Sequence, residues 1–195
     1  MSRCLRSVSR ASPSDVFRYS FASGSVVDTC VTFERRWEDN PVHDNYYPEP
    51  GTKKVTYREG VFVGYRGYEK NNVKPLFPFG YGLSYTTFKY SNLQLSPTQA
   101  TFDVTNTGQR AGAAVAQLYV GSPAGAVPRP AKELKGFAKV NLKPGETQHI
   151  TLPLNDRSFS YYDVGSKQWK IPPGSYSVMV GSSSEQIELT GKVTR

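Results

Sequence analysis

The feature that most constrains the fold of this chain is an alternation of apolar and polar residues between turn signals, which begins near Thr86. In residues 100–106 (ATFDVTN), Phe102 and Val104 alternate with polar neighbours, and residues 146–154 (ETQHITLPL) repeat the pattern through Ile150 and Leu152. A period of two places successive side chains on opposite faces of a β-strand. The pattern therefore predicts short strands that bury one face.

Other segments of this half of the chain extend the series of expected strands. They are residues 86–95, 113–121, 132–142, 158–163, 168–181 and 183–193. Residues 113–121 (AAVAQLYVG) form a more continuously apolar run, which is typical of a central strand that is covered on both faces. The side chains expected to point inward are Phe88, Leu93, Phe102, Val104, Leu118, Val120, Leu134, Phe137, Ile150, Leu152, Tyr176, Val178 and Val180.

Turn residues separate these segments. Asn106, Thr107 and Gly108 supply one turn, and Pro144-Gly145 supplies a tight turn with proline at its first central position. About seven short strands with such spacing predict an all-β fold, an antiparallel sandwich of fibronectin type III or immunoglobulin-like type. The Cys–Trp–Cys pattern of antibody domains is absent, and Trp169 is expected to cover one end of the core.

The residues before Thr86 differ in character. Residues 31–85 are rich in aromatic rings and turns, and Pro41, Pro48, Pro50, Pro75 and Pro78 argue against long helices there. So many rings would be costly to leave in water, so this irregular linker is expected to pack on another surface. Residues 1–30 show neither the period of two of a strand nor the period of about 3.6 of a helix. They stay unassigned, as a disordered or frame-shifted segment. The sandwich itself is expected over residues 86–195.

The amino-acid composition argues against two classes of binding partner, nucleic acids and membranes. The chain has 24 Lys and Arg against 16 Asp and Glu, a formal net charge of +8, but its longest basic runs are the pairs 35–36 and 53–54. Nucleic-acid binding proteins usually cluster such charge, so no nucleic-acid partner is expected. No stretch approaches the roughly 20 apolar residues of a membrane helix, and no membrane partner is expected. Cys4 and Cys30 form neither a metal-ligand spacing nor a disulfide scaffold.

Several motifs in order resemble the C-terminal part of family 3 glycoside hydrolases of the β-glucosidase type. Residues 75–88 (PLFPFGYGLSYTTF) resemble the family's lead-in to its fibronectin type III-like domain, and residues 57–66 (YREGVFVGYR) resemble its linker. Residues 31–33 and 38–41 resemble the end of the second catalytic domain, which would make residues 31–85 the end of that α/β domain plus the linker. Further matching motifs are residues 115–120, 133–137, 142–146, 159–163 and 173–181.

The resemblance implies that the parent enzyme hydrolyses terminal β-D-glucosyl residues and that this chain is a structural accessory module. In the family, an Asp nucleophile lies in an N-terminal barrel and an acid/base Glu lies upstream of the linker. Neither signature occurs here, so no catalytic residue is assigned, and substrate-binding residues stay unknown. The abrupt change of character near residue 30 suggests a truncated or frame-shifted reading frame, which reading the upstream DNA in all frames would test.

Few residues of this chain are candidates for a catalytic role. Seven carboxylates crowd the linker and could be nominated as an acid and a nucleophile, although solvation of an irregular segment explains them better: Glu34, Glu38, Asp39, Asp44, Glu49, Glu59 and Glu69. His43 and His149 are the only histidines, and His149 is expected to face solvent. No metal-binding cluster or phosphate-binding loop stands out, so neither a metal nor a cofactor is expected.

Three functions stay open on the sequence. The chain is an accessory module that packs on the catalytic domains of a parent β-glucosidase, a small enzyme with its own β-glucosidase activity, or a carbohydrate-binding module that stacks Tyr and Trp rings on sugars. The exposed linker rings make self-association a further expectation. The sequence leaves the natural glycoside and the compartment open, because no signal peptide or transmembrane segment is recognisable.

Overall fold

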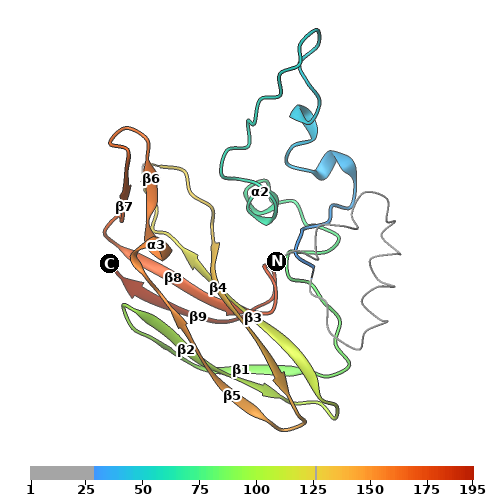
Figure 1. Ribbon diagram of the computed structural model, residues 1–195, viewed down its shortest axis with the longest axis vertical. Helices are drawn as coiled ribbons and strands as arrows, with labels where there is room; N and C mark the ends of the chain where they lie inside the picture. The colour runs from blue at the N-terminus through green and yellow to red at the C-terminus, as the bar shows by residue number, and fades with distance from the viewer. Residues whose placement is uncertain (1–28, 126) are drawn as a thin grey trace.

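The structure is a computed structural model that describes residues 29–125 and 127–195. The expectations for residues 1–28, including Cys4 and a frame shift, lie outside these described residues. Within them, seven strands form two antiparallel sheets that face each other (Figure 1). The first sheet, in the order β1-β2-β5, comprises β1 (Phe88–Leu95), β2 (Gln99–Asn106) and β5 (Thr147–Pro153). The predicted all-β sandwich is thereby confirmed.

The second sheet has four strands in the order β4-β3-β8-β9. They are β3 (Gly112–Gly121), β4 (Glu133–Leu142), β8 (Ser175–Gly181) and β9 (Ile187–Thr194). The chain passes from the first sheet to the second between β2 and β3 and returns between β4 and β5. As expected for a central strand, β3 is buried along almost its whole length on both faces.

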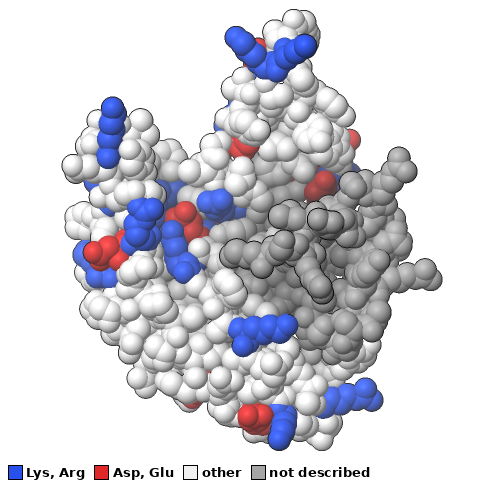
Figure 2. Space-filling view, viewed as in Figure 1, with Lys and Arg blue, Asp and Glu red and all other residues white. Residues whose placement is uncertain are grey.

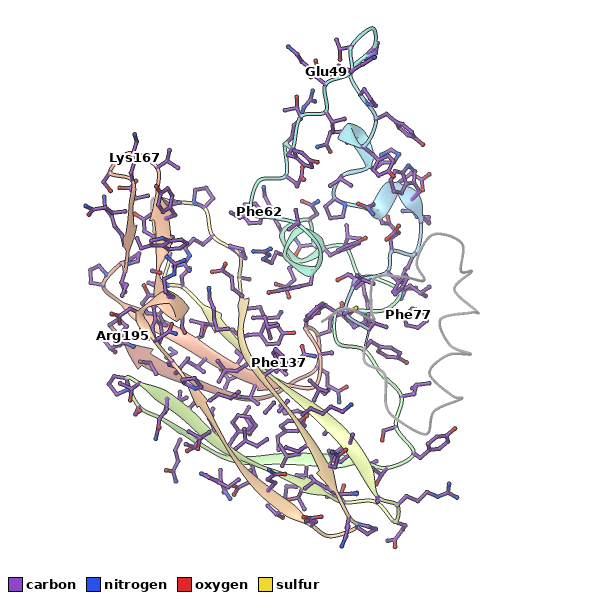
Figure 3. All side chains as sticks on the ribbon, viewed as in Figure 1. Glu49, Phe62, Phe77, Phe137, Lys167 and Arg195 are labelled. Atoms are coloured by element: carbon purple, nitrogen blue, oxygen red, sulfur yellow. The ribbon has the colours of Figure 1, made fainter. Side chains whose placement is uncertain are left out.

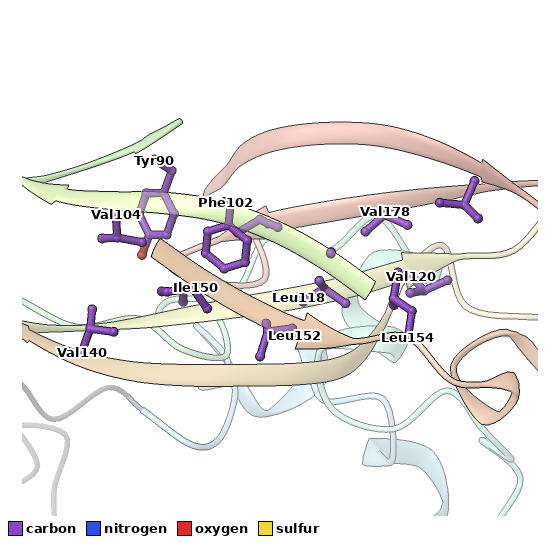
Figure 4. Close-up of a cluster of buried hydrophobic side chains, with 14 of the residues drawn as sticks. Tyr90, Phe102, Val104, Leu118, Val120, Val140, Ile150, Leu152, Leu154 and Val178 are labelled. Carbon is purple, nitrogen blue, oxygen red and sulfur yellow. The ribbon is translucent and has the colours of Figure 1, made fainter. Parts of the chain in front are cut away.

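The core fills the space between the two sheets (Figure 4). In the first sheet Phe102 lies opposite Ile150, and in the second Leu118 lies opposite Val180. Of the predicted inward side chains, nine are buried: Phe102, Val104, Leu118, Val120, Ile150, Leu152, Tyr176, Val178 and Val180. Phe88 and Leu93 pack at the margin of the core, and Leu134 is half-buried.

The predicted burial of Phe137 is wrong, because its side chain is 67% exposed. Phe137 pairs with Gln117, which points outward from β3, and directly opposed residues of paired strands lie on the same face. A register shift in β4 puts Leu134 opposite Tyr119, so Leu134 also lies on the outward face. Gly136, Ala138 and Val140 occupy the inward positions, and Phe137 shares the outward face with Lys139. Figure 3 labels Phe137 on β4.

The predicted strand over residues 158–163 is wrong in its first half. The turn of helix α3 (Asp156–Phe159) occupies it, because the side chain of Asn155 accepts a hydrogen bond from Ser158 N at 3.1 Å and caps the helix. The following β6 (Tyr161–Asp163) pairs with β7 (Gln168–Lys170) in a separate hairpin that projects from the sandwich (Figure 1).

The expectation that Trp169 covers one end of the core is also wrong. Trp169 lies on the β6–β7 hairpin and is 49% exposed, with the Arg157 guanidinium 3.3 Å from its ring centroid. Because β7 pairs with β6 in a hairpin of its own, the ring is carried away from the two large sheets. Phe159, which is fully buried against Tyr176, closes that end of the core instead.

Residues 29–87 form a second projection beside the sandwich (Figure 1). Its regular elements are short: the 3-10 turns η1 (Trp37–Asp39) and η2 (His43–Asn45), and the helix α2 (Tyr65–Lys70). An isolated bridge between Phe33 and Phe77 ties the start of this segment to its end. No helix in residues 29–125 and 127–195 is long and apolar enough to cross a bilayer.

Candidate interaction surface

The linker is docked on the outer face of the second sheet. Tyr65, on α2, accepts a hydrogen bond from the backbone N–H of Leu134 at 2.8 Å, and its ring contacts those of Tyr119 and Phe79. Tyr119 points outward from β3 but is completely buried under this contact. The predicted packing of the linker on another surface is therefore met in part by the sandwich of the same chain.

Gly80 allows the backbone of the linker to lie close to β3 of the sandwich. Gly80 adopts a φ of +83°, and a Cβ at this position would collide with the side chain of Gln117 on β3. Gln117 in turn donates to Ser182 O at 3.1 Å and accepts a hydrogen bond from the hydroxyl of Tyr119. These bonds satisfy the polar groups that the docked linker removes from water, and burial raises the pKa of Tyr119.

Another part of the linker leaves large aromatic rings exposed. Trp37 and Tyr46 meet edge to face at 5.2 Å, and Tyr46 and Tyr47 meet in the same way at 5.2 Å. Asn45 joins this row to the neighbouring segment by donating to Thr56 O at 2.9 Å. We define the aromatic surface as Trp37, Tyr46, Tyr47 and Tyr57, whose side chains are between 39% and 79% exposed. Trp37, Tyr46 and Tyr47 form a contiguous row, and contiguous exposed rings mark interaction sites.

The linker carboxylates are dispersed among separate partners. The pairs are Glu34 with Tyr68, Asp39 with Arg36, Asp44 with His43, Glu49 with Arg58, Glu59 with Asn45, and Glu69 with Lys132. Glu38 is exposed. The hydrogen bond from Arg36 lowers the pKa of Asp39, which is opposite to the shift that a general acid requires. This arrangement favours the solvating role over the catalytic one.

The two histidines also have local roles. His43 bonds the carboxylate of Asp44 at 2.9 Å, and His149, whose side chain is 60% exposed, bonds Asp103 at 2.6 Å across β2 and β5. The predicted solvent-facing position of His149 is confirmed. Within residues 29–125 and 127–195, no group of three or more His, Cys, Asp or Glu side chains could hold a metal ion.

An ion pair between Lys170 and Asp163 in the β6–β7 hairpin gives a first testable prediction. Hydrogen bonds from Lys170 and Ser166 lower the pKa of Asp163 from 3.8 to about 2. Since the folded pKa is depressed, the stabilisation is complete above about pH 4 and is lost as the pH falls towards 2. We expect Lys170→Met to raise the pKa of Asp163 towards 3.8 in a carboxyl ¹³C NMR titration.

A matched control is Lys167→Met, in the turn of the same hairpin, which should leave the midpoint of Asp163 near 2. An unchanged midpoint in Lys170→Met, or an equal rise in both variants, would show that the lysine contact does not set the pKa.

Comparison with known proteins shows which domain family and which enzymes this chain resembles. Residues 114–184 match the fibronectin type III-like domain family. The chain is 47% identical over 163 residues to the probable beta-glucosidase K of Emericella nidulans, and 41% identical over 170 residues to the thermostable beta-glucosidase B of Acetivibrio thermocellus. These matches cover 83% of this chain in both cases, but 19% and 22% of the two relatives.

Solved structures agree. The Bifidobacterium adolescentis GH3 beta-glucosidase superposes with a TM-score of 0.81 at 38% identity, over 87% of this chain and 26% of that one. The chain is similar to glycoside hydrolase family 3 enzymes. It corresponds to the C-terminal part of such an enzyme and spans about a fifth of the length of its curated relatives. A β-glucosidase 3B from Thermotoga neapolitana matches with a TM-score of 0.79 over 84% of this chain.

Sequence reasoning missed several residues that hold the linker and the sandwich together. Tyr65, Gln117 and Tyr119 form the junction between linker and sandwich, yet nothing in their spacing distinguishes them from other residues. The available signal was the apolar run of β3, which predicts a cover on both faces, including the outward face that carries Gln117 and Tyr119.

Proposed function

We propose that this chain is the accessory C-terminal part of a β-glucosidase and stabilises the catalytic domains by packing against them through the aromatic surface. Hydrolysis of terminal β-D-glucosyl residues is then the activity of the whole enzyme. The observation that carries the proposal is that Trp37, Tyr46, Tyr47 and Tyr57 remain exposed after the linker has docked on its own sandwich. The β-glucosidase names of the relatives, which are about five times longer than the matched region, support it.

The energetics suit a packing interface. Tyrosine and tryptophan rings dominate binding energy where they are fully desolvated, and each can contribute about 2 kcal/mol or more. Edge-to-face contacts already hold Trp37, Tyr46 and Tyr47 in place, so less conformational entropy is lost when a partner covers them. A retaining glycosidase needs two acids about 5 Å apart with distinct protonation states, and the separate partners of the linker carboxylates favour a solvating role instead.

A complementation experiment tests the proposal. A relative would be truncated so that only its catalytic part remains, and this part would be co-expressed with the 195-residue chain. Co-purification of the two parts and hydrolysis of an aryl β-glucoside would be measured. We expect no hydrolysis by the chain alone and a stable, active complex when both parts are present. Tyr46→Ala/Tyr47→Ala should weaken the association at least tenfold, because two desolvated rings are lost.

The matched control is Tyr162→Ala, which removes a comparably exposed ring from the β6–β7 hairpin, outside the aromatic surface. Equal association of the Tyr46→Ala/Tyr47→Ala variant and wild type would contradict the assigned surface. Turnover by the chain alone that disappears when one linker carboxylate is neutralised would instead establish an independent enzyme. Retardation on insoluble glucans would support the carbohydrate-binding alternative.

A further inference from the structure

A second feature, independent of the aromatic surface, lies in the notch between the β6–β7 hairpin and the linker (Figure 2). Three parts of the chain meet here: α2, the start of β4 with the residues before it, and the segment that enters β6. We define the cationic notch as the charged side chains that form its ion pairs: Arg66, Glu69, Arg129, Lys132, Glu133 and Lys135.

Positive charge exceeds negative charge in this notch. Lys132 pairs with Glu69. Three cations then converge on the single carboxylate of Glu133: Arg129 at 2.8 Å, Lys135 at 3.5 Å and Arg66 at 3.8 Å. The side chains of these cations are only 10–28% exposed, so solvent screens their mutual repulsion weakly. Two positive charges are left without a carboxylate.

The three cations that meet at Glu133 are not equally satisfied. Arg129 donates hydrogen bonds to the carbonyls of Phe159 and Ser160, at 3.0 and 3.4 Å, in addition to its ion pair with Glu133. Arg66, in contrast, has a buried Nε without a hydrogen-bond partner within the described residues. Buried guanidinium donors are normally paired, and an unpaired one is costly. Arg66 therefore has unused donor capacity, and Lys135 shares the carboxylate of Glu133 with two other cations.

The titration behaviour agrees with this geometry. Burial alone would raise the pKa of Glu133, but the hydrogen bond from Arg129 and the charges of Lys135 and Arg129 hold it below its ordinary value. Burial lowers the pKa of Lys135, and the neighbouring charges of Arg129 and Arg66 lower it further against the opposing effect of Glu133. The hydroxyl of Tyr65, also near this cluster, accepts its bond from Leu134 N and keeps its own proton to donate.

We propose that the cationic notch binds an oxyanion, which accepts hydrogen bonds from Arg66 and Lys135 and neutralises their excess charge. The shared chemistry is that of a phosphate, sulfate or carboxylate group with oxygen acceptors for a guanidinium and an ammonium. Because Arg66 belongs to α2 and Lys135 to β4, the bound oxyanion ties the linker to the sandwich.

The test uses the 195-residue chain and inorganic phosphate, sulfate and acetate, with sodium chloride added to hold the ionic strength constant. A ligand that binds only the folded state at ten times its Kd should raise the Tm by about 3–6 °C for a domain of this size. Arg66→Gln/Lys135→Gln should abolish that rise. Lys139→Gln, an exposed cation on the same strand, should retain it.

The anion-free melting temperature separates this role from an ordinary structural ion pair. If Arg66 and Lys135 only paired with Glu133, the double variant would melt at a lower temperature than wild type. With uncompensated cations, its Tm should be equal or higher at low salt, because repulsion is relieved while Arg129 still pairs with Glu133.

The anions distinguish the source of the ligand. Protection by phosphate and sulfate but not acetate indicates a free or bound tetrahedral anion, whereas equal protection by acetate indicates a carboxylate carried by a packed protein domain. No protection by any of them beyond chloride, or equal protection of the double variant, would overturn the site. Neither result bears on the aromatic surface, so this site and the proposed function can fail separately.

Discussion

Replacing Phe102 with alanine is expected to lower the free energy of unfolding by about 3–5 kcal/mol. The ring of Phe102 is fully buried in β2, stacks near Tyr90 with centroids 6.5 Å apart, and lies between two sheets whose spacing depends on its volume. Truncation removes the buried surface and leaves a cavity that the flanking strands can close only in part. Equilibrium urea denaturation, followed by circular dichroism, measures the change.

The matched control for this prediction is Phe137→Ala. The same chemical change is made in another strand of the same sandwich, but this ring is 67% exposed on the outer face of β4. We expect a change within about 0.5 kcal/mol, as for other surface positions. Equal destabilisation by the two substitutions would mean that Phe137 is buried in solution and that β4 is paired in another register.

Replacing Asn106 with alanine is expected to cost about 3–4 kcal/mol, although Asn106 contributes little apolar surface. Its amide accepts from Thr86 Oγ1 at 2.6 Å and Gly108 N at 3.0 Å, and donates to the carbonyls of Arg110 at 2.8 Å and Leu142 at 3.0 Å. The residue is fully buried, so alanine would leave these four groups without their partner, at about 1 kcal/mol each.

Asn141→Ala provides the control for the amide network. Asn141 is exposed on β4 directly before Leu142, and its loss should change the free energy of unfolding by less than about 0.5 kcal/mol. Urea denaturation of both variants gives the comparison. If Asn106→Ala were as mild as Asn141→Ala, water would have to replace the amide at the buried position, and the network would not determine stability.

The alternating pattern was sufficient to predict the sandwich, because burial on one face of a strand imposes a period of two on the sequence. Phe102, Val104, Ile150 and Leu152 could be placed inward on that ground alone. Phe137 could not, since its segment contains apolar residues at odd separation, and choosing which of them is buried requires the position of the opposing sheet.

Asn106 shows a second limit. The sequence indicates a turn there, and the chain does bend after Asn106, but four hydrogen bonds to this amide come from residues up to 36 positions away. The same holds for the linker: its rings predict packing, yet the split between a docked side, through Tyr65, and the exposed aromatic surface follows from which face meets β3.

For this protein, the sequence by itself determined the fold class, the family resemblance and the turn at Pro144-Gly145, because strand periodicity and turn chemistry are local properties of neighbouring residues. Only the tertiary structure decided that Tyr119 is buried, that Trp169 is carried off on a hairpin, and that the cations of the cationic notch meet at Glu133. These are contacts between segments far apart in the chain, and which of them form depends on how the two sheets and the linker pack in space.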